Sequence, residues 1–271
     1  MTTSAPIRAG ELELWVERRG SGPDVLLIAG LGDPAEAWQP QLDALADRYR
    51  LTAFDNRGVG RSPLPDEPLS VATMADDAAA ILRALDVPAA HVAGFSMGSA
   101  IAQELALRHP QLVRSLVLVS TCARPDALFR SQLACWRWLA EAAPSERAFL
   151  EVFFTWVYTP RAHADGTVDQ LIGEALAFPH QQTVEAFQAQ LDACLAHDTA
   201  DRLARIAVPT LILAGELDTI LPPRVGRLVA AEIPNARFEL MPGEAHQPFQ
   251  EAPDEFNARV DTFWRNVDAS I

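Results

Sequence analysis

The segment HVAGFSMGSA, residues 91–100, places Ser96 between two glycines, Gly94 and Gly98. The apolar residues before Ser96 are typical of a buried strand, and MGSAIAQELALRH (97–109) has a helical pattern. At a sharp turn from strand to helix, neighbouring backbone passes so close that a Cβ at either flanking position would collide. A serine that only capped the helix would not require both glycines. The segment therefore predicts an exposed serine hydroxyl above the edge of a sheet.

Strand and helix patterns alternate on both sides of this segment. We expect strands at 11–18, 24–30, 50–55, 91–95, 113–121, 209–215 and 236–241, and helices at 38–49, 70–85, 97–109, 222–233 and 254–267. Such alternation indicates βαβ units, and hence an α/β fold with a doubly wound, mostly parallel sheet. The strand at 11–18 alternates apolar and polar residues, which favours an antiparallel hairpin through Ala9-Gly10.

Residues 122–206 carry no strand pattern and are rich in aromatic residues. We expect an α/β core of residues 1–121 and 207–271, interrupted by a helical lid of residues 122–206. Most lid aromatics should pack the lid's own core. Some, with residues of the α/β core, are expected to line an apolar pocket above Ser96: Trp38, Phe95, Trp136, Phe153, Phe154 and Trp156.

A serine hydroxyl needs a base within hydrogen-bond reach, and the base needs an acid to orient it. His246 follows the expected strand 236–241, and Asp218 follows the expected strand 209–215. Both therefore lie at the carboxyl edge of the sheet, where such sheets place ligand-facing residues. Glu216 is the rival acid, two residues before Asp218. The order Ser96, Asp218, His246 is the order that a serine-elbow hydrolase requires.

Acyl chemistry also needs two backbone N–H donors for the developing oxyanion. Met97, directly after the serine, supplies one candidate, and Leu31 in the glycine-rich turn AGLGD (29–33) supplies the second. The same turn fits a dinucleotide-binding pattern from Gly30 to Ala35, with Asp55 at the end of the next strand. Asp33 and Pro34 argue against that interpretation, because they add negative charge and remove an N–H where pyrophosphate would bind.

The formal net charge of −14 argues against nucleic-acid and anionic-membrane partners, because both rely on Lys and Arg. The N-terminal segment has no signal-peptide pattern, and no apolar run is long enough to cross a bilayer. Three widely spaced cysteines (Cys122, Cys135 and Cys194) indicate free thiols and no metal site. We therefore expect a cytoplasmic protein without cofactor or metal, and whether it forms a homo-oligomer stays open.

Five segments together resemble the α/β-hydrolase superfamily: LLIAGLGD, AFDNRGVGRS, HVAGFSMGSAIAQELALRHP, PTLILAGELDTILPP and MPGEAHQPFQEAPDEFN. The chain is most similar to the group of esterases, enol-lactonases and "non-haem bromoperoxidases". The resemblance implies an eight-stranded sheet with a lid between strands six and seven. It also implies a triad of Ser96, Asp218 and His246, oxyanion donors at Leu31 and Met97, and a structural role for Asp55 and Arg57.

At two positions this sequence departs from the pattern of its relatives, and these departures narrow the expected activity. Many relatives have His-Gly where this chain has Ala29-Gly30, so a polar side chain behind the oxyanion loop is absent. Ser99-Ala100 follows the elbow, whereas relatives that act on menaquinone precursors have Gly-Arg there. A serine nucleophile also argues against haloalkane dehalogenases and epoxide hydrolases, which use an aspartate.

The sequence thus predicts a serine hydrolase that cleaves a carboxylic ester or lactone of a small to medium, mostly apolar substrate. Two alternatives stay open. The same triad can make peracids, which is perhydrolase or cofactor-free haloperoxidase activity. Alternatively, the protein is a small-molecule receptor that senses its ligand with a hydrolase pocket.

Overall fold

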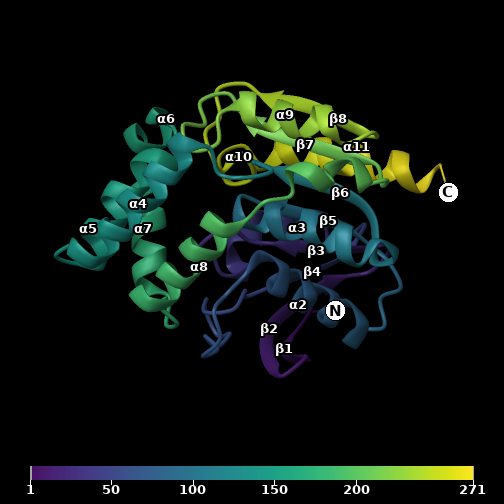
Figure 1. Cartoon of the computed structure of the whole chain (residues 1–271), viewed down its shortest axis with the longest axis horizontal. Helices are drawn as coiled ribbons and strands as arrows, with labels where there is room; N and C mark the ends of the chain where they lie inside the picture. The colour runs from purple at the N-terminus through teal and green to yellow at the C-terminus, as the bar shows by residue number, and fades with distance from the viewer. Residues whose placement is uncertain (1, 271) are drawn as a thin grey trace.

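An eight-stranded sheet forms the centre of the computed structural model, which describes residues 2–270 (Figure 1). The strand order is β1-β2-β4-β3-β5-β6-β7-β8. β2 pairs antiparallel with both β1 and β4, and all other pairs are parallel. The strands are β1 (Thr2–Ala9), β2 (Leu12–Gly20), β3 (Asp24–Ile28), β4 (Arg50–Phe54), β5 (Ala90–Phe95), β6 (Val113–Val119), β7 (Thr210–Gly215) and β8 (Ala236–Met241).

Helices cover both faces of the sheet, which explains why the central strands are continuously apolar. Leu26 and Ile28 of β3 pack into one core with α2 (Val71–Ala84), α3 (Met97–Arg108) and α9 (Pro223–Glu232). Val25 and Leu27 of the same strand pack on the other face with α1 (Gln39–Leu45), α10 (Pro248–Glu251) and α11 (Pro253–Asp268). The prediction of a doubly wound, mostly parallel sheet is confirmed.

Individual elements match the expected segments with small shifts. The N-terminal hairpin turns at Gly10, whose φ of +64° favours glycine. The helix expected over 38–49 is shorter: a 3-10 turn, Ala35–Trp38, precedes α1, which ends at Leu45. It ends there because the chain must turn back to enter β4, where the N–H of Arg50 donates to the carbonyl of Pro23 at 2.9 Å.

Between β6 and β7 the chain forms a helical insertion, residues 122–206, which contains no strand within the described chain. Figure 1 shows its helices grouped on one side of the sheet. They are α4 (Ala127–Ala142), α5 (Glu146–Val157), α6 (Pro160–Ala164), α7 (Thr167–Ala177) and α8 (Val184–Ala196), followed by the 3-10 helix η3 (Ala200–Arg205).

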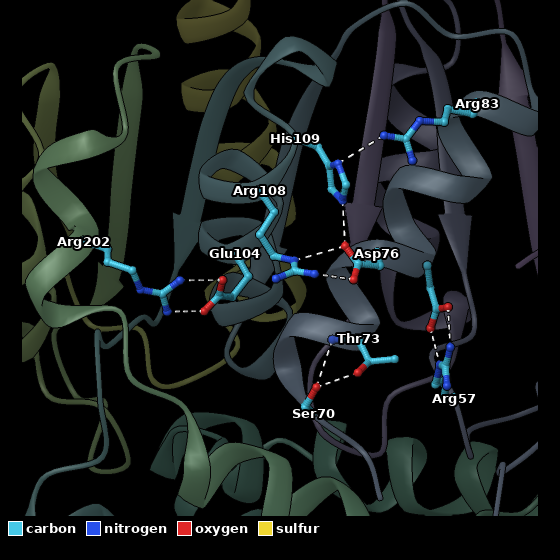
Figure 2. A network of polar contacts seen from close by, with 10 residues as sticks. Arg57, Ser70, Thr73, Asp76, Arg83, Glu104, Arg108, His109 and Arg202 are labelled. Atoms are coloured by element: carbon cyan, nitrogen blue, oxygen red, sulfur yellow. Dashed lines mark hydrogen bonds and ion pairs between the residues drawn. The ribbon is translucent and has the colours of Figure 1, made fainter. Parts of the chain in front are cut away.

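Polar contacts fix α3, the helix that begins at the serine elbow, against its neighbours (Figure 2). Asp76 of α2 accepts hydrogen bonds from Arg108 at 3.0 Å and from His109 at 2.7 Å. On the other side of α3, Glu104 accepts a hydrogen bond from Arg202 of η3 at 3.0 Å. The Arg202 pair ties the end of the insertion to the elbow helix, and the Asp76 pairs hold that helix against α2.

Within residues 2–270, no helix combines the length and apolar character that a membrane span requires.

Candidate active site

Ser96 lies at the junction of β5 and α3 with a φ of 51° and a ψ of −115°. A Cβ at Gly94 would lie 2.2 Å from the carbonyl oxygen of Gly98. A Cβ at Gly98 would lie 2.1 Å from the carbonyl oxygen of Ile28. Both contacts are with backbone, which cannot move aside as a flexible side chain can. The structure thus gives the physical reason for the two glycines that flank Ser96.

The structure brings the three predicted residues of the triad into one hydrogen-bonded chain. His246 Nε2 lies 3.0 Å from Ser96 Oγ, and His246 Nδ1 lies 2.8 Å from Asp218 Oδ2. With a proton on Nδ1 donated to the carboxylate, Nε2 is free to accept the serine proton. Asp218 and His246 are both buried, so the pair is shielded from water.

Asp218 is held by the loop that follows β7. Its Oδ1 accepts hydrogen bonds from the N–H groups of Ile220 at 2.8 Å and Leu221 at 2.9 Å, which leaves Oδ2 for His246. The rival Glu216 is exposed and accepts a hydrogen bond from the N–H of Gly243 at 2.9 Å. The geometry therefore favours Asp218 as the acid that orients the histidine.

The backbone of His246 is fixed from two directions. Its N–H donates to the carbonyl of Val157, at the end of α5, at 3.0 Å, and its carbonyl accepts from Ser120 Oγ at 2.8 Å. The ring of Phe95 lies beside the imidazole, with the two centroids 4.9 Å apart. The loop that carries His246 is thus supported both by the sheet and by the helical insertion.

Other histidines occupy structural positions. His91 is fully buried and bonds to Ser115 Oγ at 2.7 Å, and burial lowers its pKa to about 4. Burial likewise lowers the pKa of His197 to about 4. Neither ring reaches Ser96, whereas His246 does.

The sequence predicts the N–H groups of Leu31 and Met97 as oxyanion donors. In residues 2–270 neither Leu31 nor Met97 has a hydrogen-bond acceptor for its N–H, whereas the N–H of Ser96 donates to the carbonyl of Val119 at 2.9 Å. The N–H of Gly32 donates to Gln190 Oε1 of α8 at 3.0 Å, and Gln190 Nε2 donates to the carbonyl of Arg57 at 3.0 Å. The fully buried Gln190 side chain thus bridges the oxyanion loop and the loop after β4.

Asp55 and Arg57 have the structural roles expected of them. The Asp55 carboxylate accepts N–H groups from Ala35 at 2.7 Å and Arg61 at 2.9 Å, which orders the turn after β4. Arg57 forms a two-pronged ion pair with Asp77 of α2. Because Asp55 is occupied by these contacts, it is not available as the ribose-binding acid of a dinucleotide site.

The expectation that Trp38 lines the pocket is wrong. The 3-10 turn Ala35–Trp38 directs its side chain beneath the sheet, where it is fully buried and stacks on Phe249 with a centroid distance of 4.3 Å. Phe95 is also buried, and its ring packs beside His246. Trp136 is buried among insertion aromatics, with the ring of Phe153 edge-on at 5.0 Å.

Phe153, Phe154 and Trp156 of α5 are half-buried, so they retain surface that a substrate could contact. Trp156 also lines a cleft of about 680 Å³ between the base of the insertion and the loops beside Asp218 and His246. Phe187 of α8 was not among the expected pocket residues, yet its ring lies 3.8 Å from a Cβ placed on Gly32. The position of Phe187 could not be predicted from the sequence, because its contact near Gly32 depends on how α8 docks.

No group of three or more His, Cys, Asp or Glu side chains within the described residues is arranged to hold a metal ion.

Comparisons with known proteins agree with this architecture. A family model described as the alpha/beta hydrolase fold matches residues 23–253. The chain is 35% identical over 259 residues to "Putative carbamate hydrolase RutD" of Azorhizobium caulinodans, covering 96% of this chain and 97% of that protein. It is 32% identical to "Putative non-heme bromoperoxidase BpoC" of Mycobacterium tuberculosis, covering 95% and 100%.

A solved structure gives the same result. The thermophilic esterase from Thermogutta terrifontis superimposes with a TM-score of 0.85 at 26% identity, over 98% of this chain and 99% of that chain. The fold and the sequence relatives together define the class: the chain belongs to the α/β-hydrolase family. It is an enzyme of that class, as the resemblance of its motifs implied.

Proposed function

We propose that this protein is a serine hydrolase that cleaves a carboxylic ester or lactone through an acyl-enzyme on Ser96. The observation that carries the proposal is the chain of hydrogen bonds from Ser96 Oγ to His246 to Asp218, at 3.0 Å and 2.8 Å. A serine next to such a base can act as a nucleophile at neutral pH, whereas a serine in an ordinary loop cannot.

In the proposed mechanism, His246 Nε2 removes the Ser96 proton as Oγ attacks the carbonyl carbon. The N–H groups of Leu31 and Met97 hold the oxyanion, and Asp218 stabilises the imidazolium. His246 then gives the proton to the leaving alcohol. Water, deprotonated by the same histidine, attacks the acyl-enzyme and releases the acid, which regenerates Ser96.

The aromatic residues of the insertion favour a substrate with apolar surface. Phe153, Phe154 and Trp156 offer partly exposed aromatic surface on α5, and Phe187 lies over the oxyanion loop. In this proposal the helical insertion of residues 122–206 is the lid that covers the triad. Phe95 and the buried Trp136 support the pocket without providing its surface.

Two related reactions use the same acyl chemistry and are supported by the relatives. The similarity to a protein named as a carbamate hydrolase makes a carbamate a second candidate substrate, since its carbonyl fits the same oxyanion site. The similarity to a protein named as a non-heme bromoperoxidase supports peracid formation, in which hydrogen peroxide replaces water at the acyl-enzyme. Bromination that requires both acetate and peroxide would identify that activity.

The test is a rate comparison on p-nitrophenyl butyrate, a lactone and an aryl carbamate. We expect the wild type to hydrolyse at least one of them. The variant Ser96→Ala should lose about 10⁴- to 10⁶-fold in kcat, which is the usual effect of removing the nucleophile. An active wild type matched by Ser96→Ala would reject the proposal. Tight binding with almost no turnover would instead support the receptor alternative.

A further inference from the structure

Asp33 is an acidic residue beside the proposed site that the mechanism above does not use. Its Oδ2 lies 2.8 Å from a Cβ placed on Gly30, so the carboxyl packs on the backbone that precedes the oxyanion donor Leu31. Its one side-chain partner, Gln247 Nε2, donates at the long distance of 3.4 Å. The backbone N–H of Gly30 is a second partner, so about half of the roughly four hydrogen bonds that a carboxylate can accept stay unused.

Asp33 is buried close to His246. Burial raises the pKa of Asp33 to about 7, although the nearby His246 and the hydrogen bonds from Gln247 and the Gly30 N–H act in the opposite direction. Nevertheless, part of the residue surface stays accessible to solvent. The carboxyl of Asp33 therefore lies beside His246 and packs on the backbone that leads to Leu31, at the border of the proposed site.

We propose that Asp33 is a specificity-determining carboxylate of the substrate pocket, which favours acyl substrates that carry an ammonium or N–H donor close to the carbonyl. This inference rests on the proposed function. When Leu31 holds the carbonyl oxygen, the first atoms of the acyl chain lie near Gly30, on which Asp33 packs. A buried carboxylate with unused acceptor capacity is costly unless a donor or cation joins it.

The same geometry makes selectivity depend on pH. Two titratable groups face Asp33: His246 from the loop after β8, and Tyr158 at the end of the insertion helix α5. When Asp33 is ionised, its charge opposes the oxyanion that forms on a neutral ester, whereas a substrate ammonium compensates that charge. Preference for the ammonium substrate should therefore increase as the pH rises through about 7.

The experiment compares kcat/KM for methyl 3-aminopropanoate and methyl butyrate, which differ by an ammonium group in place of a methyl group. The proteins are the wild type, Asp33→Asn and the control Asp66→Asn, whose aspartate is exposed. At about pH 8 the ammonium-to-neutral ratio should be about tenfold higher in the wild type than in Asp33→Asn. The wild-type ratio should approach that of Asp33→Asn at about pH 6, and Asp66→Asn should follow the wild type.

Equal ratios in the wild type and Asp33→Asn, unchanged between these pH values, would overturn the inference even if the proposed function holds. If neither ester turns over above the level of Ser96→Ala, the proposed function has failed for these esters. Binding of the same two esters is then measured at about pH 8 in the Ser96→Ala background. The inference predicts about tenfold tighter binding of the ammonium ester, lost in Ser96→Ala/Asp33→Asn. Equal binding of the two esters overturns it.

Discussion

Ser96 has a strained backbone conformation with a positive φ, which its neighbours impose. Because the backbone at Gly94 and Gly98 has no room for a side chain, the turn stays sharp and the hydroxyl stays beside His246. A positive φ at a residue other than glycine costs free energy and persists where the surrounding structure enforces it. Here β5, α3 and the end of β3 enforce it together.

Gly98→Ala should therefore destabilise the protein strongly. The new Cβ would lie 2.1 Å from the carbonyl oxygen of Ile28, which forces α3 away from β3. We expect a loss of about 3 kcal/mol or more in the free energy of unfolding, measured by urea denaturation. Gly173→Ala, in α7 where nothing lies within 4 Å of the added Cβ, is the control and should be neutral or stabilise by up to about 1 kcal/mol. Similar effects at both positions would contradict this explanation.

Asp33→Asn should raise stability at alkaline pH. The ordinary pKa of an aspartate is 3.8, whereas burial raises the pKa of Asp33 in the folded state to about 7, so the folded state binds this proton more tightly than the unfolded chain does. Ionisation of Asp33 therefore lowers stability progressively between these two values, and the loss is complete above pH 7. A difference of about 1 kcal/mol in the free energy of unfolding corresponds to roughly 2–4 °C in Tm for a domain of this size class.

Thermal melts of the wild type and Asp33→Asn across the pH range check this. The variant should have the higher Tm above pH 7, and the difference should disappear below pH 3.8, where the carboxyl is protonated in both the folded and the unfolded chain. A constant difference at all pH values would mean that ionisation of Asp33 is not its cause.

At the scale of elements, α8 connects the helical insertion to the oxyanion loop. Gln190 of α8 accepts the Gly32 N–H at 3.0 Å, and Gln182, which precedes α8, donates to the carbonyl of Gly58 in the loop after β4 at 3.1 Å. The insertion therefore holds the loop that carries Leu31. Docking of α8 and orientation of Leu31, the proposed oxyanion donor, are parts of one arrangement.

Gln190→Met keeps the length of the side chain and removes its hydrogen bonds. We expect kcat on a turned-over ester to fall about tenfold with a smaller change in KM, because a loosened Leu31 N–H weakens transition-state binding. The control is Gln188→Met on the same helix, whose amide donates to Glu141 within the insertion at 2.7 Å. Unchanged kcat in Gln190→Met, or an equal loss of kcat in both variants, would show that α8 does not position the oxyanion loop.

The elements of the α/β core could be predicted because their signals are local. Asp218 and His246 each follow an apolar strand, so sheet topology alone brings them to one edge. The position of Trp38 could not be derived in this way, since an apolar residue after a glycine-rich turn can face either the pocket or the core. Gln190 and Phe187 carried no sequence signal, because their contacts with Gly32 depend on how α8 packs across the molecule.

For the whole molecule, the insertion and the sheet share one hydrophobic core. Leu133 of α4 and Leu191 of α8 belong to the same buried cluster as Ile28 of β3 and Ile101 of α3. Residues in one contiguous core tend to unfold together. The insertion should therefore not melt separately from the sheet.

Leu133→Ala tests this coupling from within the insertion. Because Leu133 is 1% exposed, the truncation should cost about 2–5 kcal/mol. Tryptophan fluorescence reports on both parts of the molecule, and far-ultraviolet circular dichroism reports on the backbone. Both should show one transition at the same lowered midpoint. Two separate transitions, with only the first one shifted, would show that the insertion unfolds independently.

The central claim is that His246 and Asp218 make Ser96 a nucleophile. The most direct measurement is labelling with a fluorophosphonate probe, followed by mass spectrometry of the peptides to locate the modified residue. The account predicts rapid modification of the wild type on Ser96 alone, strongly slowed labelling of His246→Ala, and none of Ser96→Ala. Labelling of another serine, or equal labelling of the wild type and Ser96→Ala, would contradict it.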